Sequence, residues 1–379
     1  MKIALTLYNA NFLGGGNKFT AELAQTLLKK GHQVALCAAN KPERGKCHNT
    51  LLDFDPVFTA EPFRPLRKAK LYISSFLVSR ALRQCFDRFR PEVIINADAP
   101  PATFSLIKHK DVRLVQYVHW PTELQSYRHS IFLEFYRALY WGLHYKALKK
   151  LDAVVCNSNY TRQVTHLMWH REVPSDQFHV AYPPVDVERF KKMKTPRREM
   201  VSCIGRLDPN KGIDMVIDAF LTVQDEFPEL TLTIAGALNT GDVYTSSYYP
   251  KLKTRLETLN NPRISLIVNP SDEEIIRLYK SSKCFANFNP GEHFGICAIE
   301  SQAAGAIPIV ARGGGQLETV HHEKTGFLVE NQSEMVESIR KVFSSIQRYR
   351  QMSQNAVRWS ETFSLASFES SWSEIFEKL

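Results

Sequence analysis

The stretch Asn289-Pro-Gly-Glu-His-Phe-Gly-Ile-Cys-Ala-Ile-Glu300 joins a predicted strand to a predicted helix. Residues 284–287 before it are typical of a buried strand, and residues 295–304 have the composition of a helix packed on that strand. Open α/β sheets bind ligands at the carboxyl ends of their strands. We therefore expect a binding site in this loop.

Two carboxylates in this stretch indicate what the ligand carries. Glu292 lies in the predicted loop, and Glu300 lies about one turn inside the helix. Free N–H groups at the helix N-terminus favour an anion such as a diphosphate, but carboxylates repel one, so their expected partners are hydroxyl groups. A ligand with both groups suggests a nucleotide sugar.

The rest of the chain predicts an α/β protein with two Rossmann-like, doubly wound domains that face each other across a cleft. Short β-rich segments alternate with helical patterns from end to end, which is typical of parallel sheets with crossover helices. Polar, charged residues at 185–198 predict a linker. The predicted parts are an N-terminal domain at 1–190, a C-terminal nucleotide-sugar-binding domain at 195–360, and a helix at 361–379.

Two cations follow the first strand of the second predicted domain, in Cys203-Ile-Gly-Arg-Leu-Asp-Pro-Asn-Lys-Gly212. Arg206 can bind a phosphate through two parallel hydrogen bonds, and Lys211 can act as a point charge. We expect them to form a diphosphate clamp, with solvated loop charge as the alternative. No Asp-x-Asp pair suited to Mg²⁺ is found, so no metal and no cofactor is expected.

The first predicted domain offers a glycine loop and a histidine. Gly14, Gly15 and Gly16 follow the first strand, where N–H groups can bind phosphate or an acceptor oxygen, although a simple tight turn remains an alternative. His119 ends a buried strand at 114–119 and is expected to reach the cleft or to bond a nearby carbonyl. A second glycine loop, at 313–315, is expected beside Glu292.

Composition limits the functions further. The net charge is +9, and residues 1–190 hold 26 Lys and Arg against 16 Asp and Glu. This excess, concentrated at 63–70 and 80–90, suits an anionic membrane face or a solvated helix, while no motif supports nucleic-acid binding. Seven cysteines without a C-x-x-C pair are typical of a reduced cytoplasm.

Together these segments resemble the family 4 retaining glycosyltransferases of the GT-B fold. The resemblance rests on the 14–16 loop, His119, Arg206 with Lys211, the Glu292–Glu300 spacing and the 313–315 loop, and it spans nearly the whole chain. Tyr117-Val-His-Trp-Pro and Glu292-His-Phe-Gly-Ile are similar to mannosyltransferases that build lipid-linked oligosaccharides from GDP-mannose at the cytosolic membrane face. In that fold the C-terminal helix crosses back to the first domain.

The resemblance implies a role for each residue around the donor. Glu292 would bond hydroxyls of the donor sugar, and Glu300 those of the ribose. Arg206 and Lys211 would stabilise the leaving diphosphate. His119 would orient the donor sugar, and Gly15 and Gly16 would contact phosphate or acceptor from the other domain. The loop residues His293, Phe294, Gly295 and Ile296 would help to bind the donor.

The implied activity is metal-independent, retaining transfer of a hexose, with mannose favoured. The donor would be GDP-mannose, with a UDP-sugar possible, and the acceptor a glycan or lipid-linked glycan. The expected location is the cytoplasm, with peripheral binding to the cytosolic face of a membrane. A nucleotide-sugar epimerase of the same fold and a non-catalytic nucleotide-sugar-binding subunit remain alternatives.

Overall fold

The structure, a computed structural model, describes residues 1–11, 15–45, 47, 49–60, 70–107, 111–124, 131–238 and 243–379. The chain divides into two compact units. The N-terminal unit comprises Met1–Tyr182 with Glu369–Leu379, and the C-terminal unit comprises Pro183–Phe368. Gly14 and the basic segment 63–69 of the sequence predictions lie outside the described residues.

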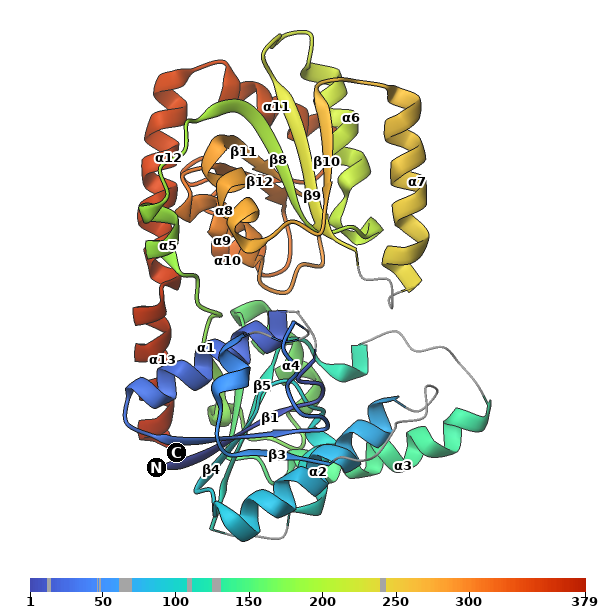
Figure 1. The fold of residues 1–379 in the computed structure, drawn as a ribbon, viewed down its shortest axis with the longest axis vertical. Helices are drawn as coiled ribbons and strands as arrows, with labels where there is room; N and C mark the ends of the chain where they lie inside the picture. Colours follow the sequence, from blue (N-terminus) through green and yellow to red (C-terminus); the bar gives the residue numbers. More distant parts are fainter. Residues whose placement is uncertain are drawn as a thin grey trace. The chain divides into compact units, whose positions relative to one another are not determined.

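The N-terminal unit contains a seven-stranded, all-parallel sheet in the order β3-β2-β1-β4-β5-β6-β7 (Figure 1). Its strands are buried along almost their whole length, because helices cover both faces of a doubly wound sheet. The strands are β1 (Lys2–Leu7), β2 (Gln33–Ala38), β3 (Val57–Thr59), β4 (Val93–Asn96), β5 (Arg113–Val118), β6 (Ala153–Cys156) and β7 (Phe178–Val180). The main helices are α1 (Gly15–Lys29), α2 (Lys70–Arg88), α3 (Ile131–Leu148) and α4 (Asn159–Trp169).

The C-terminal unit contains a six-stranded, all-parallel sheet in the order β10-β9-β8-β11-β12-β13. The strands are β8 (Arg198–Arg206), β9 (Thr231–Ala237), β10 (Ile264–Val268), β11 (Ser282–Ala286), β12 (Ile307–Ala311) and β13 (Phe327–Val329). The helices are α5 (Val187–Lys192), α6 (Ile213–Val223), α7 (Val243–Leu259), α8 (Asp272–Ser281), α9 (Ile296–Ala303), α10 (Gln316–Thr319), α11 (Gln332–Phe343) and α12 (Ile346–Ser360).

The predicted linker at 185–198 is wrong in its first half, which forms helix α5. The Asp186 side chain accepts a hydrogen bond from the N–H of Arg189 and so caps the helix. Val187 and Phe190, three residues apart, are buried, and the Phe190 ring lies 6.1 Å from that of Tyr279. Two apolar residues at helical spacing thus outweigh the polar composition of the segment.

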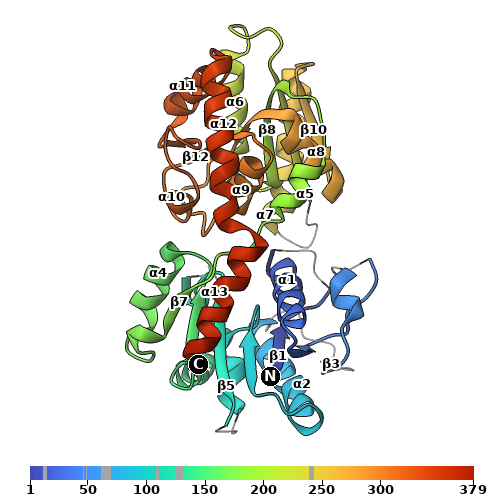
Figure 2. The same cartoon turned by 90° about the vertical axis from the view of Figure 1, so that its left-hand side faces the viewer.

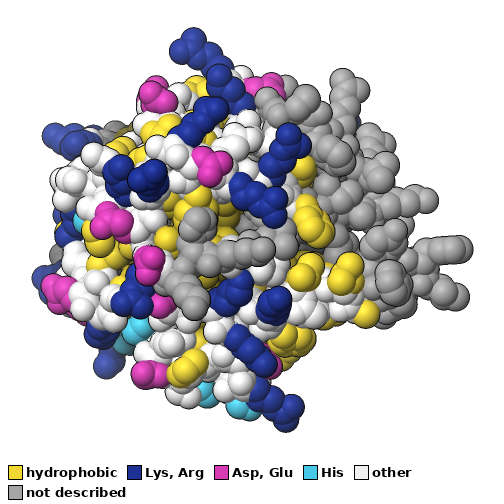
Figure 3. Space-filling view, turned by 90° about the horizontal axis from the view of Figure 1, so that it is seen from below, with side chains coloured by type: hydrophobic (Ala, Val, Ile, Leu, Met, Phe, Trp, Pro, Cys, Tyr) yellow, Lys and Arg dark blue, Asp and Glu magenta, His cyan; other side chains and the backbone are white. Residues whose placement is uncertain are grey.

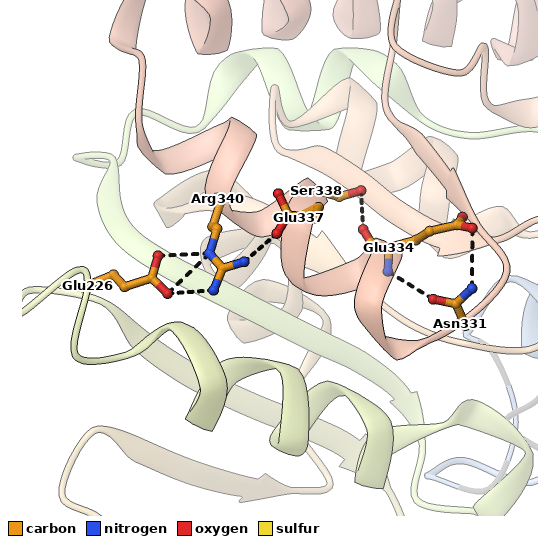
Figure 4. Close-up of polar contacts among 6 residues, drawn as sticks. All are labelled: Glu226, Asn331, Glu334, Glu337, Ser338 and Arg340. Atoms are coloured by element: carbon orange, nitrogen blue, oxygen red, sulfur yellow. Dashed lines mark hydrogen bonds and ion pairs between the residues drawn. The ribbon is translucent and has the colours of Figure 1, made fainter.

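Helix α11 shows how polar side chains fix the outer layer of the C-terminal unit (Figure 4). Asn331 caps its N-terminus by accepting a hydrogen bond from the N–H of Glu334 at 3.0 Å. Near its other end, Arg340 donates to both carboxylate oxygens of Glu226 and also pairs with Glu337. These contacts orient the helix over a core that includes Met335 and Ile339.

The last helix, α13 (Leu365–Lys378), begins in the C-terminal unit and belongs from Glu369 onward to the N-terminal unit. Figure 2 shows this segment lying against the N-terminal sheet and its helices. Trp372 is almost fully buried there, with its ring 6.2 Å from that of Tyr117. Phe376 packs against His32, and Ser373 accepts a hydrogen bond from Lys30.

Candidate active site

The C-terminal sheet reverses its strand order between β8 and β11. Chain connections on the two sides of such a point diverge, which leaves a crevice beyond the carboxyl ends of the two strands. The segment after β8 carries Lys211, and the segment after β11 carries Glu292. The N–H of Phe288 donates to the carbonyl of Lys211 at 3.1 Å, which joins the two segments directly.

Lys211 and Glu292 form an ion pair at this edge. Lys211 Nζ lies 2.6 Å from Glu292 Oε2, and the side chains are 14% and 20% exposed. Burial opposes the charge on both groups, but their mutual attraction outweighs it, raising the pKa of Lys211 and lowering the pKa of Glu292. Both residues are therefore charged at neutral pH while a ligand can still reach them.

Arg206, the second predicted cation, ends strand β8 and contacts a different acid. Its guanidinium lies 3.3 Å from Asp208 Oδ2, and its side chain is 58% exposed. Asp208 is almost fully buried, and its other oxygen accepts a hydrogen bond from the N–H of Asn210. The fixed Asp208 carboxylate thus limits the directions that Arg206 can take. Sequence reasoning did not identify Asp208.

The second glycine loop supports the loop of Glu292, as its predicted position implied. The N–H of Gly315 donates to the carbonyl of Glu292 at 2.8 Å. Gly314 has a φ of +58°, and a Cβ placed there would lie 2.1 Å from the same carbonyl oxygen. Only glycine permits such a close approach of two backbones. The 313–315 loop therefore determines where the Glu292 backbone can lie.

The other predicted donor-binding residues lie on the same segment or on helix α9. His293 is partly buried, and burial lowers its pKa, so its imidazole is neutral at pH 7. Phe294 is buried, and its ring lies 5.8 Å from that of Phe363. Gly295 precedes α9 and Ile296 begins it.

Glu300 lies one turn further along α9, as predicted. Burial, then Cys297, then Glu300 raise the pKa of Tyr279, a fully buried residue of α8, so this acid lies within electrostatic range of the Tyr279 hydroxyl. These four residues, at the end of β8, in the segments after β8 and β11, and on α9, thus lie around one edge of one sheet: Arg206, Lys211, Glu292 and Glu300.

The remaining predicted site residues, Gly15, Gly16 and His119, belong to the N-terminal unit. Gly15 and Gly16 form the first turn of α1. His119 directly follows β5, its ring packs against those of Phe19 and Tyr117 at 5.4 and 4.9 Å, and its carbonyl accepts a hydrogen bond from Asn157.

A buried acid beyond His119 was missed by sequence reasoning. Glu123 accepts hydrogen bonds from His144 Nε2 at 2.8 Å and from Trp169 Nε1 at 2.5 Å. The His144 and Glu123 side chains are 0% and 7% exposed. Burial opposes ionisation of Glu123, but the hydrogen bond and charge of His144 lower its pKa. His144 and Trp169 thus fix the segment that follows His119.

Within the described ranges, no group of three or more His, Cys, Asp or Glu side chains is arranged to hold a metal ion.

Two family models match the chain. The first, described as glycosyl transferases group 1, matches residues 185–359, and the second, described as Glycosyltransferase Family 4, matches residues 13–189. The chain belongs to glycosyltransferase family 4. The resemblance drawn from the sequence motifs is therefore confirmed.

Similar curated proteins include mannosyltransferases. A GDP-Man:Man(3)GlcNAc(2)-PP-Dol alpha-1,2-mannosyltransferase of Dictyostelium discoideum is 23% identical, over 78% of this chain and 65% of its own. A D-inositol 3-phosphate glycosyltransferase of Corynebacterium glutamicum is 27% identical, over 59% of this chain and 57% of its own. The chain thus spans less than two thirds of the length of these two relatives.

Solved structures establish the fold. The Anabaena HepE structure in complex with UDP and glucose matches with a TM-score of 0.75 at 18% identity, and the match covers 100% of both chains. With two all-parallel sheets and such neighbours, the protein has the predicted α/β GT-B fold. This chain, a family 4 glycosyltransferase, is similar in sequence to mannosyltransferases such as the Dictyostelium protein.

Proposed function

We propose that this glycosyltransferase moves mannose from GDP-mannose to a glycan or lipid-linked glycan, with retention of anomeric configuration and without a metal. The observation that carries the proposal is the Lys211–Glu292 pair at the strand reversal, beside the N-terminus of α9. The ammonium group of Lys211 and the carboxylate of Glu292 are 2.6 Å apart and still accessible, so they suit a ligand that has a phosphate close to a hydroxyl group.

The proposed reaction breaks the bond between the anomeric carbon and the diphosphate, and the acceptor oxygen forms the new bond to that carbon. The acceptor proton leaves with the diphosphate. Negative charge builds on the diphosphate, so preorganised cations are expected to be the main catalytic contribution. Lys211 and Arg206 supply that charge, Glu292 accepts hydrogen bonds from sugar hydroxyls, and Glu300 accepts them from the ribose.

Support for mannose comes from the names of relatives such as the Dictyostelium enzyme. HepE, in contrast, was crystallised with UDP and glucose, so the donor has to be tested directly. Thermal shift with a panel of GDP- and UDP-sugars at equal concentration identifies it, because a tighter-binding ligand stabilises the folded protein more. A larger shift with UDP-glucose than with GDP-mannose would contradict the proposed donor.

Turnover of the selected donor then tests the reaction class. Release of nucleoside diphosphate with transfer to an acceptor supports the transferase, while conversion of the donor sugar without an acceptor indicates an epimerase. Binding without turnover indicates a non-catalytic subunit. NMR of the product measures anomeric configuration, and activity undiminished in excess EDTA supports the metal-free mechanism.

We also propose that the N-terminal unit binds an anionic membrane surface. None of the described helices is long and apolar enough to cross a bilayer. Among the described residues of this unit, exposed apolar side chains include Phe76, Leu124, Leu139 and Leu167. Figure 3, a view onto this unit, shows Lys and Arg side chains spread over it, with acids and apolar patches between them. Such a surface binds anionic lipids, so co-sedimentation that does not depend on anionic lipid would contradict the proposal.

A further inference from the structure

The strand order of the N-terminal sheet also reverses, at the point between β1 and β4. The connection after β1 leads into α1, which starts at Gly15, and the segment after β4 carries Asp98. Parallel sheets bind ligands beyond the carboxyl ends of strands at such a reversal. Asp98 therefore lies where this fold is expected to hold a ligand, although none of the roles proposed above uses it.

A buried polar network fixes the backbone that carries Asp98. Asn96, which is fully buried, receives a hydrogen bond from Thr6 at 2.5 Å and donates to Gln116 Oε1 at 2.7 Å. Asn96 also donates to the carbonyl of Ala99 at 2.8 Å and accepts from its N–H at 3.0 Å. One side chain thus holds the residue that follows Asp98 and ties this segment to strands β1 and β5.

The opposite side of the reversal is fixed in a similar way. The Asn17 amide on α1 donates to the carbonyls of Asn9 and Ala10, at 2.9 and 3.1 Å. This holds the first turn of α1 at the edge of the sheet. A Cβ placed on Gly16 would lie 2.8 Å from Asp98 Oδ1, so the glycine leaves the space that the carboxylate occupies.

Asp98 itself is exposed, and its carboxylate makes no hydrogen bond or ion pair with any residue that the structure describes. The surrounding bonds therefore fix the segment that carries the carboxylate but offer it no counter-charge, and partial desolvation by its neighbours raises the pKa of Asp98 to about 7. Near neutral pH a substantial fraction of Asp98 is ionised, and this form only accepts hydrogen bonds, so its partner is a donor such as a hydroxyl. A diphosphate would be repelled, and the donor's hydroxyls already have proposed partners in Glu292 and Glu300.

We propose that Asp98 is an acceptor-binding residue whose carboxylate accepts a hydrogen bond from the sugar hydroxyl that receives the transferred hexose. This inference rests on the proposed function, and it specifies which substrate the N-terminal edge binds. The network around Asn96 then positions Asp98 before the acceptor arrives, which limits the entropy lost on binding.

The test compares Asp98→Asn with a matched control, Asp111→Asn. Asp111 is also exposed but lies before β5, at the amino edge of the same sheet. The probes are GDP-mannose and, in parallel, UDP-glucose, with octyl glycosides of mannose, glucose and N-acetylglucosamine as acceptors. Asp98→Asn is expected to lower kcat/KM for the acceptor by about 10- to 100-fold, as for loss of a charged hydrogen bond.

Three further measurements separate acceptor binding from a structural role. Donor hydrolysis without an acceptor, the thermal shift caused by the nucleotide sugar, and the melting temperature are expected to stay unchanged in Asp98→Asn. In Asp111→Asn, all measurements including acceptor kinetics are expected to match the wild type.

Wild-type acceptor kinetics in Asp98→Asn, or an equal loss in donor hydrolysis, would overturn the inference and leave the proposed function intact. Wild-type protein that hydrolyses its donor but glycosylates no octyl glycoside would overturn it as well. If the wild type releases no nucleoside diphosphate from either donor, the proposed function fails first and the inference falls with it.

Discussion

The Lys211–Glu292 and His144–Glu123 pairs are the same kind of interaction in two different surroundings. Their heavy-atom distances are 2.6 and 2.8 Å, and in both the acid has a lowered pKa. The first pair lies at a sheet edge with side chains 14% and 20% exposed, whereas the second is enclosed by rings such as those of Tyr140 and Trp169, at 0% and 7%.

From the difference in exposure we expect the more exposed pair to serve catalysis and the enclosed pair to serve stability. An enclosed pair can exchange partners only if the unit opens, and breaking it leaves a buried polar group without compensation. An accessible pair can exchange its partner for a ligand at little cost. We therefore expect substitutions at Lys211 to affect catalysis, and substitutions at Glu123 to affect the stability of the N-terminal unit.

The largest effect is expected for Lys211→Ala. Loss of one preorganised charge at a transition state typically lowers the rate by about 10²–10³-fold, or about 3–4 kcal/mol. Single-turnover rates with saturating donor measure it, and Lys253→Ala, which removes an exposed lysine of α7, is the control. A loss below about fivefold would contradict a catalytic role for this pair, because it is far less than such groups supply.

Gly314→Ala tests whether the glycine loop positions Glu292. The new Cβ would lie 2.1 Å from the Glu292 carbonyl oxygen, so that backbone has to move. A displacement of about 1 Å can cost about 100-fold in kcat/KM. Gly31→Ala is the matched control, since Gly31 also has a positive φ but no heavy atom within 4 Å of the added Cβ. Equal activities of the two variants would show that only backbone strain matters.

Glu123→Gln is expected to destabilise the N-terminal unit by about 2 kcal/mol, since two buried donors lose a charged acceptor. For a unit of this size the melting temperature should fall by about 4–8 °C. Calorimetry measures this change, with the exposed Asp176→Asn as control. An unchanged melting temperature would mean that the enclosed pair contributes nothing to stability.

The lowered pKa of Glu123 predicts that its contribution to stability depends on pH. Because the folded-state pKa of Glu123 is lowered, its contribution is fully present above the unfolded value of about 4.3 and is lost as pH falls through the folded value. The difference between wild type and Glu123→Gln should therefore be constant near neutral pH and shrink below about pH 4. A difference that grows on acidification would contradict the ionised state of Glu123.

The smallest effect is expected for Arg206→Ala. Its side chain is 58% exposed, so solvent screens its charge more than that of Lys211. A loss of about tenfold in kcat/KM is expected, equivalent to one hydrogen bond to a charged group. Arg277→Ala, on the exposed face of α8, is the control. A loss as large as that of Lys211→Ala would mean that Arg206 is desolvated when the donor binds.

Much of the fold could be predicted because its signals are local. Segments such as β4 and β12 are apolar and buried on both faces, so their composition alone indicates strands. Strand β3 and helix α5 were missed, because three residues at a sheet edge and two apolar residues in a charged segment carry little periodicity.

The site could be predicted only in part, for the same reason. Lys211 and Glu292 follow strands, so a shared sheet edge could be expected, but their direct contact depends on how loops 81 residues apart pack. Glu123 pairs with His144, which lies on α3. The backbone next to Asp98 is held by Asn96, which accepts a hydrogen bond from Thr6. Such contacts are tertiary, and no spacing in the sequence indicates them.

The contribution of residues 369–379 to the N-terminal unit has a consequence for synthesis. Trp372 packs near Tyr117, which stacks on Phe19 and lies beside His119, yet it leaves the ribosome after the whole C-terminal unit has been translated. The N-terminal sheet therefore cannot complete its aromatic packing before the C-terminal unit has been translated. Until then, a nascent chain would expose this cluster to chaperones.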